Sequence, residues 1–203
     1  LHGEGHSFPT RRSSDLQTAI MKATFDALVA YGYAGLTIDR IGEFFPKSKS
    51  LLYHHYEGKD DLLLDFLERL IESREAEFSP REDVDARTRL ERLLEGIAAS
   101  EMSDADRGFS RALVELRAQA AHDEDYREHF TRSDQFFREW IADIVRDGIE
   151  EGVFREVDPE QVAATIHVLA GGILTERVTS DDPQVEAVRA ELDAYVQARL
   201  LAE

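Results

Sequence analysis

The chain of 203 residues contains no cysteine, only five prolines and no long hydrophobic run. Without cysteine it can form no disulfide and has no cysteine nucleophile. No apolar run approaches the roughly 18 residues that span a bilayer, and we find no secretory signal. The lack of a glycine-rich phosphate loop and of an HExxH zinc motif argues against an enzyme. With few prolines and long segments of helical periodicity, the sequence predicts an all-α protein of about nine helices.

Residues 37–56, TIDRIGEFFPKSKSLLYHHY, predict two short helices joined by a tight turn. Isoleucines recur at helical spacing in the first helix, and Thr37 can cap it with its hydroxyl. Pro46 ends this helix, because proline lacks an amide donor and disfavours helix at the preceding residue. Ser48 can cap the second helix, which carries small polar and basic residues. Two such helices make a helix-turn-helix, whose second helix enters the major groove of DNA.

Residues 17–70 are similar to the DNA-binding domain of the TetR family of transcriptional regulators. The likeness is carried by Ala30-Tyr31-Gly32-Tyr33, Leu36-Thr37-Ile38, Ile41, Ser48, Leu52-Tyr53-His54-His55-Tyr56, Lys59, Asp61 and Leu62. The chain departs from the family pattern at Phe45-Pro46, where a small residue and a glycine are usual, and at Gly42, where alanine is usual. Since proline cannot take a positive φ, the turn must differ locally, and the angle of the second helix stays open.

The resemblance places DNA contacts on the second helix and its flanks. Lysine meets phosphates as a mobile charge, and tyrosine and histidine can hydrogen-bond them. We therefore predict contacts with double-stranded DNA from Thr37, Lys47, Ser48, Lys49, Ser50, Tyr53, His54 and Lys59. The alternative is that these are solvated polar residues. Because His54 and His55 point about 100° apart on a helix, with no suitably spaced carboxylate nearby, we predict no metal site.

After a helix-turn-helix domain at residues 17–61, residues 62–203 form the predicted ligand-binding and dimerisation domain. This half resembles the choline-responsive BetI-like branch of the family in Leu113-Val114-Glu115-Leu116-Arg117, the His122-Asp123 turn and Gly152-Val153-Phe154. Asp158-Pro159-Glu160 predicts a helix start, since a cap, a proline at the first position and an acid in the first turn follow one another.

Aromatic residues recur at helical spacing in this domain and either line a cavity or form plain core. The candidate contacts of a lipophilic or cationic effector are Phe109, Glu115, Phe137, Trp140 and Ile166. Glu115 can neutralise a cationic ligand or form a surface salt bridge with Arg117 or Arg111. We also predict a homodimer. Its interface would include three small residues that allow two helices to approach closely, Ala170, Gly171 and Gly172, and an apolar row formed by Leu192, Val196 and Leu200.

Residues 1–16 are set apart from the fold prediction. Residues 6–16 read HSFPTRRSSDL, which one reading frame of a common sequencing adapter encodes, so we interpret residues 1–16 as non-native sequence. The alternative is a flexible basic arm whose Arg11 and Arg12 reach a minor groove.

Lysine is rare, and charge is divided unevenly along the chain. The formal net charge is −18, and the four lysines all lie within residues 17–61. That segment holds five basic and six acidic residues, whereas residues 62–203 hold 17 arginines and 34 acidic residues. Such an acidic, lysine-poor composition resembles that of proteins from salt-loving microbes; the alternative is an ordinary acidic surface that aids solubility.

These features predict a cytoplasmic DNA-binding regulator. We expect a ligand-responsive repressor that binds a palindromic operator as a homodimer and needs no cofactor and no membrane. The alternative is a protein of the same fold that binds small molecules and has weak or no DNA binding.

Overall fold

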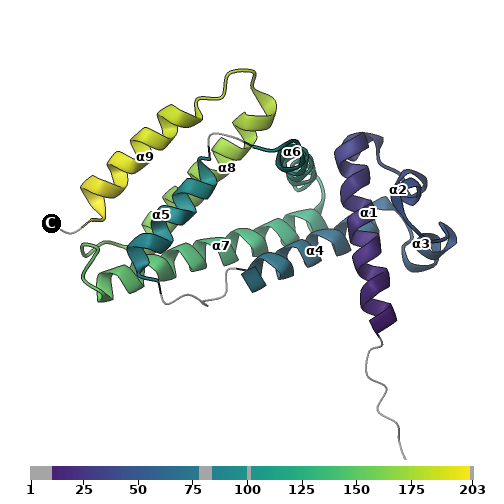
Figure 1. Ribbon diagram of the computed structural model, residues 1–203, viewed down its shortest axis with the longest axis horizontal. Coiled ribbons are helices and arrows are strands. Elements are labelled where there is room, and N and C mark those ends of the chain that lie inside the picture. Colours follow the sequence, from purple (N-terminus) through teal and green to yellow (C-terminus); the bar gives the residue numbers. More distant parts are fainter. Residues whose placement is uncertain (1–10, 78–83, 100–101, 202–203) are drawn as a thin grey trace, which may run out of the picture. The chain divides into compact units, whose positions relative to one another are not determined.

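The computed structural model describes residues 11–77, 84–99 and 102–201. Within these ranges nine α-helices make up the secondary structure, apart from one isolated bridge (Figure 1), which confirms the all-α prediction. The helices form two compact units, and the boundary between the units lies between Leu67 and Glu68, inside α4 (Lys59–Glu77). The domain boundary predicted from the sequence lies six residues earlier, after Asp61. No helix in the described ranges is long and apolar enough to cross a membrane.

The first unit begins with α1 (Arg11–Gly35). Gly32 interrupts its helical backbone with φ 63° and ψ 172°, a conformation that glycine adopts without steric cost, so the helix end predicted here is confirmed. The helix starts earlier than the expected Gln17, because residues 11–16 contain no proline or glycine and can extend a helix that is already nucleated. Residues 1–10 of the segment interpreted as non-native lie outside the described residues.

Two short helices, α2 (Ile38–Phe44) and α3 (Ser50–His55), complete the helix-turn-helix, and α2 packs against both α1 and α3. The main buried residues of this unit are Ile20, Ala23, Ala27, Leu28, Leu36, Ile38, Ile41, Phe45, Leu52, Leu62, Leu63 and Phe66. Helices as short as α2 and α3 are unstable in isolation. Burial of their apolar side chains, which contributes about 25 cal/mol per Å², therefore stabilises α2 and α3 as helices.

The second unit contains the end of α4 and five further helices, which are α5 (Ala86–Ile97), α6 (Asp104–Gln119), α7 (Glu124–Glu150), α8 (Pro159–Thr179) and α9 (Val185–Arg199). α7 packs against α5, α6 and α8, and α8 also packs against α5, α6 and α9 (Figure 1). Side-chain oxygens cap four of these helices, from Asp85, Ser103, Asp123 and Asp158. The helix start predicted at Asp158-Pro159 is therefore confirmed.

The turn after α7 fastens the end of α9 to the rest of the second unit. Gly152 has φ +74°, and an added Cβ at Gly148 would lie 2.0 Å from the Phe154 ring. This close approach lets Phe154 bury its ring, and the Arg155 N–H then donates to the Leu200 carbonyl at 2.7 Å. Packing and backbone hydrogen bonds thus hold α9 in place.

Candidate functional site

The residues predicted to contact DNA gather around α3 of the first unit. Seven of the eight are exposed, namely Thr37, Lys47, Ser48, Lys49, Ser50, Tyr53 and His54. Leu52 on the other side of α3 is fully buried, so it fixes the rotation of this helix with the polar residues outward. Lys59, the eighth, is half-buried.

A buried phenylalanine, not a glycine, builds the turn between α2 and α3. Phe45 is 6% exposed and extended, with φ −84° and ψ 122°, as expected of a residue that precedes proline. No residue of this turn, all of which the structure describes, has a positive φ. The chain therefore accommodates Phe45-Pro46 by burying the ring and extending the backbone.

The N-terminus of α3 is capped by the Ser48 hydroxyl. Lys49, which directly precedes α3, has helical φ and ψ and makes no capping hydrogen bond with its side chain. The Ser48 hydroxyl accepts the Ser50 N–H at 3.3 Å, as predicted for a cap, and shares a hydrogen bond of 2.7 Å with the Ser50 hydroxyl. This local turn, which serine hydroxyls favour, places both hydroxyls at the start of α3. The Thr37 cap on α2 is confirmed, since its hydroxyl accepts the Arg40 N–H at 3.2 Å.

The Lys49 side chain lies across α2. Its Cγ, Cδ and Cε are 2.6, 2.8 and 2.9 Å from the point where a Cβ at Gly42 would stand, and its Nζ is 3.6 Å from the Asp39 carboxylate. Desolvation, and after it the charge and hydrogen bonding of Asp39, raise the pKa of the Tyr53 hydroxyl. One carboxylate thus interacts with two of the residues predicted to contact DNA.

Lys59 binds the start of α4 to the end of α1. Its Nζ donates to the Tyr33 carbonyl at 3.2 Å and lies 4.1 Å from the centre of the Tyr33 ring. The Tyr33 hydroxyl in turn donates to Asp60 at 3.0 Å. Because an ammonium group has three donors, Lys59 can serve this structural contact and still offer a hydrogen bond to a phosphate.

The five candidate effector contacts lie on three helices of the second unit that pack against one another. Phe109 and Glu115 are on α6, Phe137 and Trp140 on α7, and Ile166 on α8. Ile166 is fully buried in the core, and Trp140 packs against the same core.

Two hollows on the described surface have other lining residues. One, of about 610 Å³, is lined by residues at and just after the end of α5 and by residues of α9, and the other, of about 420 Å³, by residues of α7. None of the five candidate effector contacts lines either hollow.

A polar cluster that the sequence did not reveal joins α6, α7 and α8. Arg117 donates two hydrogen bonds, of 3.0 and 2.6 Å, to the Asp134 carboxylate, and His167 Nε2 lies 3.3 Å from the same group. The Arg117 guanidinium also lies over the Phe130 ring at 4.6 Å. Arg117, considered as a partner of Glu115, therefore pairs with Asp134.

The surroundings of Asp134 keep it ionised. Burial raises its pKa, but the hydrogen bonds and charges of His167 and Arg117 outweigh burial and hold the pKa well below its usual range. The sequence carries a signal for this cluster, because Asp134 is one turn from both Phe130 and Phe137. A carboxylate on an apolar face requires partners.

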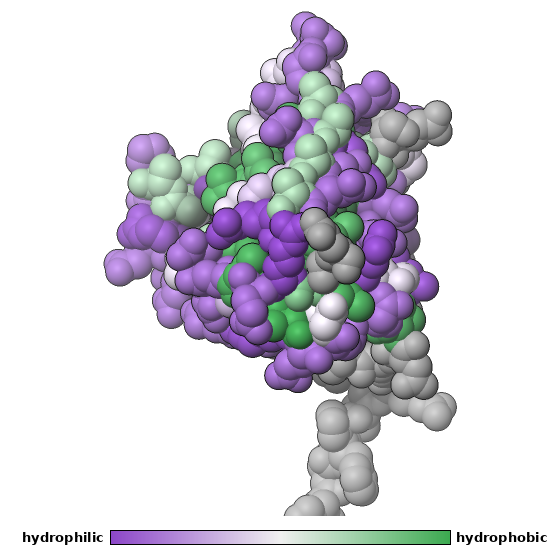
Figure 2. Space-filling model, turned by 90° about the vertical axis from the view of Figure 1, so that its left-hand side faces the viewer, coloured by the Kyte–Doolittle hydropathy of each residue, from purple (hydrophilic) through white to green (hydrophobic). Residues whose placement is uncertain are grey.

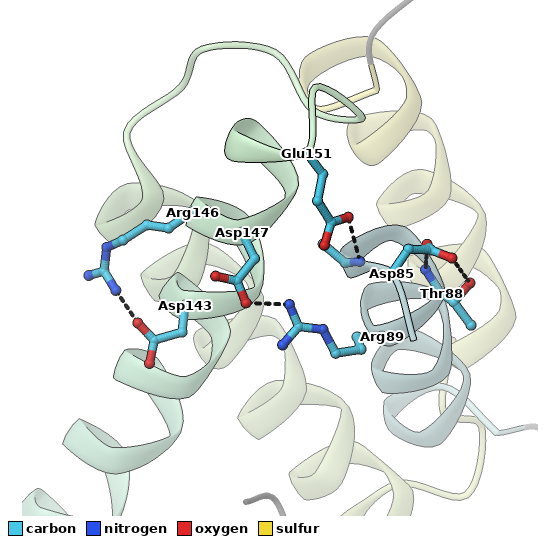
Figure 3. Close-up of polar contacts among 8 residues, drawn as sticks. Asp85, Thr88, Arg89, Asp143, Arg146, Asp147 and Glu151 are labelled. Carbon is cyan, nitrogen blue, oxygen red and sulfur yellow. Dashed lines mark hydrogen bonds and ion pairs between the residues drawn. The ribbon is translucent and has the colours of Figure 1, made fainter. Parts of the chain in front are cut away.

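A second polar cluster ties the start of α5 to the end of α7 (Figure 3). Arg89 pairs with Asp147, and the Glu151 carboxylate accepts the Ala86 N–H at 3.0 Å. The second bond satisfies one of the amides that every helix leaves free at its start. These contacts fix the position of α5 on α7.

The residues predicted at a dimer interface divide into two groups. Gly171 and Gly172 are exposed on α8, with nothing within 4 Å of an added Cβ, whereas Ala170 beside them is half-buried. Leu192, Val196 and Leu200 are buried in the core of their own unit. Their assignment to an interface is therefore corrected, because these side chains already pack against the chain that carries them.

The exposed sides of α8 and α9 carry small residues. On α8 the two glycines share a stripe with Ala164, Val168 and Thr175, and on α9 the exposed residues include Ala187, Ala190, Ala194 and Ala198. Hydrophilic residues dominate the face of the protein shown in Figure 2, in keeping with the net charge of −18. In the described ranges no three histidine or carboxylate side chains form a group suited to a metal ion.

The chain matches two protein-family models. Residues 20–66 match the bacterial regulatory proteins of the tetR family, and residues 86–201 match the C-terminal region of BetI-type transcriptional repressors. None of the curated proteins compared matches the chain.

Solved structures agree with the family models. A TetR transcription regulator from Haloarcula marismortui is 34% identical, with a TM-score of 0.81 over 92% of this chain and 99% of that chain. A transcriptional regulator from Saccharomonospora viridis in complex with choline is 21% identical, with a TM-score of 0.76 over 94% of this chain and 100% of that chain; at this identity the likeness shows the fold alone. The helix-turn-helix, the family models and the Haloarcula structure together establish that the chain belongs to the TetR family of transcriptional regulators.

Proposed function

We propose that this TetR-family regulator is a ligand-responsive repressor that binds a near-palindromic operator as a homodimer. The observation that carries DNA binding is the exposure of seven candidate contact residues around α3, while Leu52 anchors the other side of that helix. Lysine, serine, tyrosine and histidine side chains supply hydrogen bonds to phosphates and base edges. Because the proposed partner is chromosomal DNA, we infer action in the cytoplasm and regulation rather than catalysis.

The exposed stripe of α8 supports the proposed homodimer. Gly171 and Gly172 permit close approach of a second helix, and Val168 on the same stripe is 71% exposed. A two-fold pairing of α8 and α9 would bury this stripe and present two copies of α3 to successive major grooves, about 34 Å apart. Val168→Glu should therefore give monomers in light scattering. A variant that stays dimeric, or a wild type that is monomeric at micromolar concentration, would contradict this interface.

We propose further that a small lipophilic or cationic effector binds the second unit and releases the operator. The match to BetI-type repressors and the choline complex of the Saccharomonospora protein support a cationic effector. Aromatic rings bind quaternary ammonium groups through cation–π interactions, so Phe109, Phe137 and Trp140 are the candidate contacts, with Glu115 as counter-charge. The effector must favour the arrangement that does not bind DNA, since only a difference in affinity shifts the equilibrium.

A gel shift with the DNA that flanks the gene tests both proposals. We expect a retarded band that choline, another quaternary ammonium compound or a lipophilic compound abolishes. Glu115→Gln should weaken the response to cationic compounds and leave DNA binding intact.

A chain that binds such a compound but retards no DNA at low salt would favour the alternative function, a small-molecule-binding protein of the same fold. The ion pair that Lys49 forms with Asp39 within the first unit favours this alternative.

A further inference from the structure

An acidic side chain lies among the residues proposed to meet DNA. Asp39 in the first turn of α2 is 68% exposed, and its carboxylate is 3.6 Å from the Lys49 ammonium. The same carboxylate interacts with the Tyr53 hydroxyl. A carboxylate accepts hydrogen bonds and shares the sign of the DNA charge, so it cannot itself bind a phosphate.

Gly42 is the second part of this arrangement. A Cβ at this position would stand less than 3 Å from three carbons of the Lys49 stem, so the bare glycine is what lets the lysine lie flat on α2. Asp39 and Gly42 are three residues apart and therefore share one face of that helix. The space at Gly42 and the charge of Asp39 together hold the Lys49 side chain against α2.

We propose that Asp39 is an internal competitor for the DNA backbone, which holds Lys49 in the free protein until an operator phosphate displaces it. The inference rests on the proposed DNA-binding function. The exchange replaces one anion by another on the same donors, so each phosphate contact gains less than it would with free side chains. Phosphate contacts supply nearly all non-specific binding, and the competitor therefore lowers the affinity for random DNA.

Three variants test this inference in the full-length chain. Asp39→Asn removes the competing charge. Gly42→Ala leaves every charge in place, displaces the flexible lysine stem and introduces a better helix former. Glu43→Gln is the matched control, because Glu43 lies on the same helix, carries the same charge and pairs with Tyr31.

Binding is measured by fluorescence anisotropy with two labelled duplexes, one selected by the wild type from a random library and one of random sequence. An exposed ion pair changes an equilibrium by a factor of about 1.5 to 5, and a dimer carries two pairs, so we expect Asp39→Asn to bind about fivefold more tightly. Its salt slope should steepen, because no freed carboxylate then offsets the charge that Lys49 brings to the phosphate. Gly42→Ala should also bind more tightly, and Asp39→Asn should gain little in a Lys49→Ala background.

Each outcome decides the matter. Tighter binding by both Asp39→Asn and Gly42→Ala, with Glu43→Gln unchanged, supports the competitor. Equal or weaker binding by Asp39→Asn overturns it, and so does an equal gain in Glu43→Gln, which would indicate a general effect of charge. A wild type that binds neither duplex would overturn the proposed function, and this inference with it.

Discussion

Asp134→Asn should destabilise the second unit by removing the charge that α6 and α8 share. The wild-type carboxylate accepts two hydrogen bonds from Arg117, of 3.0 and 2.6 Å, and lies 3.3 Å from His167. Asparagine keeps the size of the side chain but offers one oxygen instead of two. Its amide group would also face a guanidinium, which can only donate.

The magnitude follows from the exposure of the partners. Hydrogen bonds to charged groups contribute about 1.5–3 kcal/mol each when well shielded. The Asp134 side chain is 20% exposed, but that of Arg117 is 47% exposed, so solvent screens the pair and much of this value is lost. We expect the free energy of unfolding to fall by about 2 kcal/mol, which corresponds to about 4–8 °C in melting temperature for a chain of this size.

The pH dependence gives a second measurement. The folded pKa of Asp134 is depressed below the unfolded value of about 3.9, so its contribution to stability is present above pH 4 and is lost as pH falls through the folded pKa. The difference in stability between wild type and Asp134→Asn should therefore shrink as pH falls below about 4.

Urea unfolding followed by circular dichroism at matched protein concentration measures this difference. Asp143→Asn is the control, because Asp143 lies on the same helix and its pair with Arg146 is exposed; such pairs contribute about 0.3–0.5 kcal/mol. Equal losses in the two variants would refute the argument that the three-helix cluster holds the second unit together.

Gly148→Ala should cost about 1–3 kcal/mol, because the new Cβ overlaps the Phe154 ring, whereas Gly171→Ala has open space around its Cβ; equal melting temperatures would contradict this packing argument. Lys59→Ala should lower the melting temperature, because it removes the contacts of the ammonium group with the Tyr33 carbonyl and ring, and should weaken binding to all DNA sequences alike with a salt slope lower by about 0.9 per half-site. A loss confined to one sequence in anisotropy titrations would contradict a phosphate contact. If the chain is salt-adapted, DNA binding should survive about 1 M salt, and loss by about 0.2 M would contradict that interpretation alone.

The elements that the sequence predicts well depend on residues close together in the chain. Gly32 ends the helical part of α1 and Asp158-Pro159 begins α8, because a positive φ or a cap is decided within a few residues. The exposure of the candidate DNA contacts on α3 was predictable for the same reason, since the helix-turn-helix is a local motif.

The contacts that the sequence does not predict join distant residues or depend on the course of a long side chain. Arg117 and Asp134 are 17 residues apart, and their meeting with His167 depends on the rotation of three helices. The return of Lys49 to Asp39 depends on the bare face of Gly42. The sequence shows only that Lys49 is a cation in an exposed stretch. It does not show which rotamer the lysine adopts, because that depends on the free space on the neighbouring helix.

α9 shows why an apolar row does not by itself identify an interface. Leu192, Val196 and Leu200 recur at i, i+4 and i+8, and this spacing predicts a covered face without saying what covers it. Large side chains remove more apolar surface from water, at about 25 cal/mol per Å². A partner within the chain is present at every protein concentration, whereas a second copy is not. The large residues therefore go to the core, and the small exposed residues of α8 and α9 are left where another helix can approach closely.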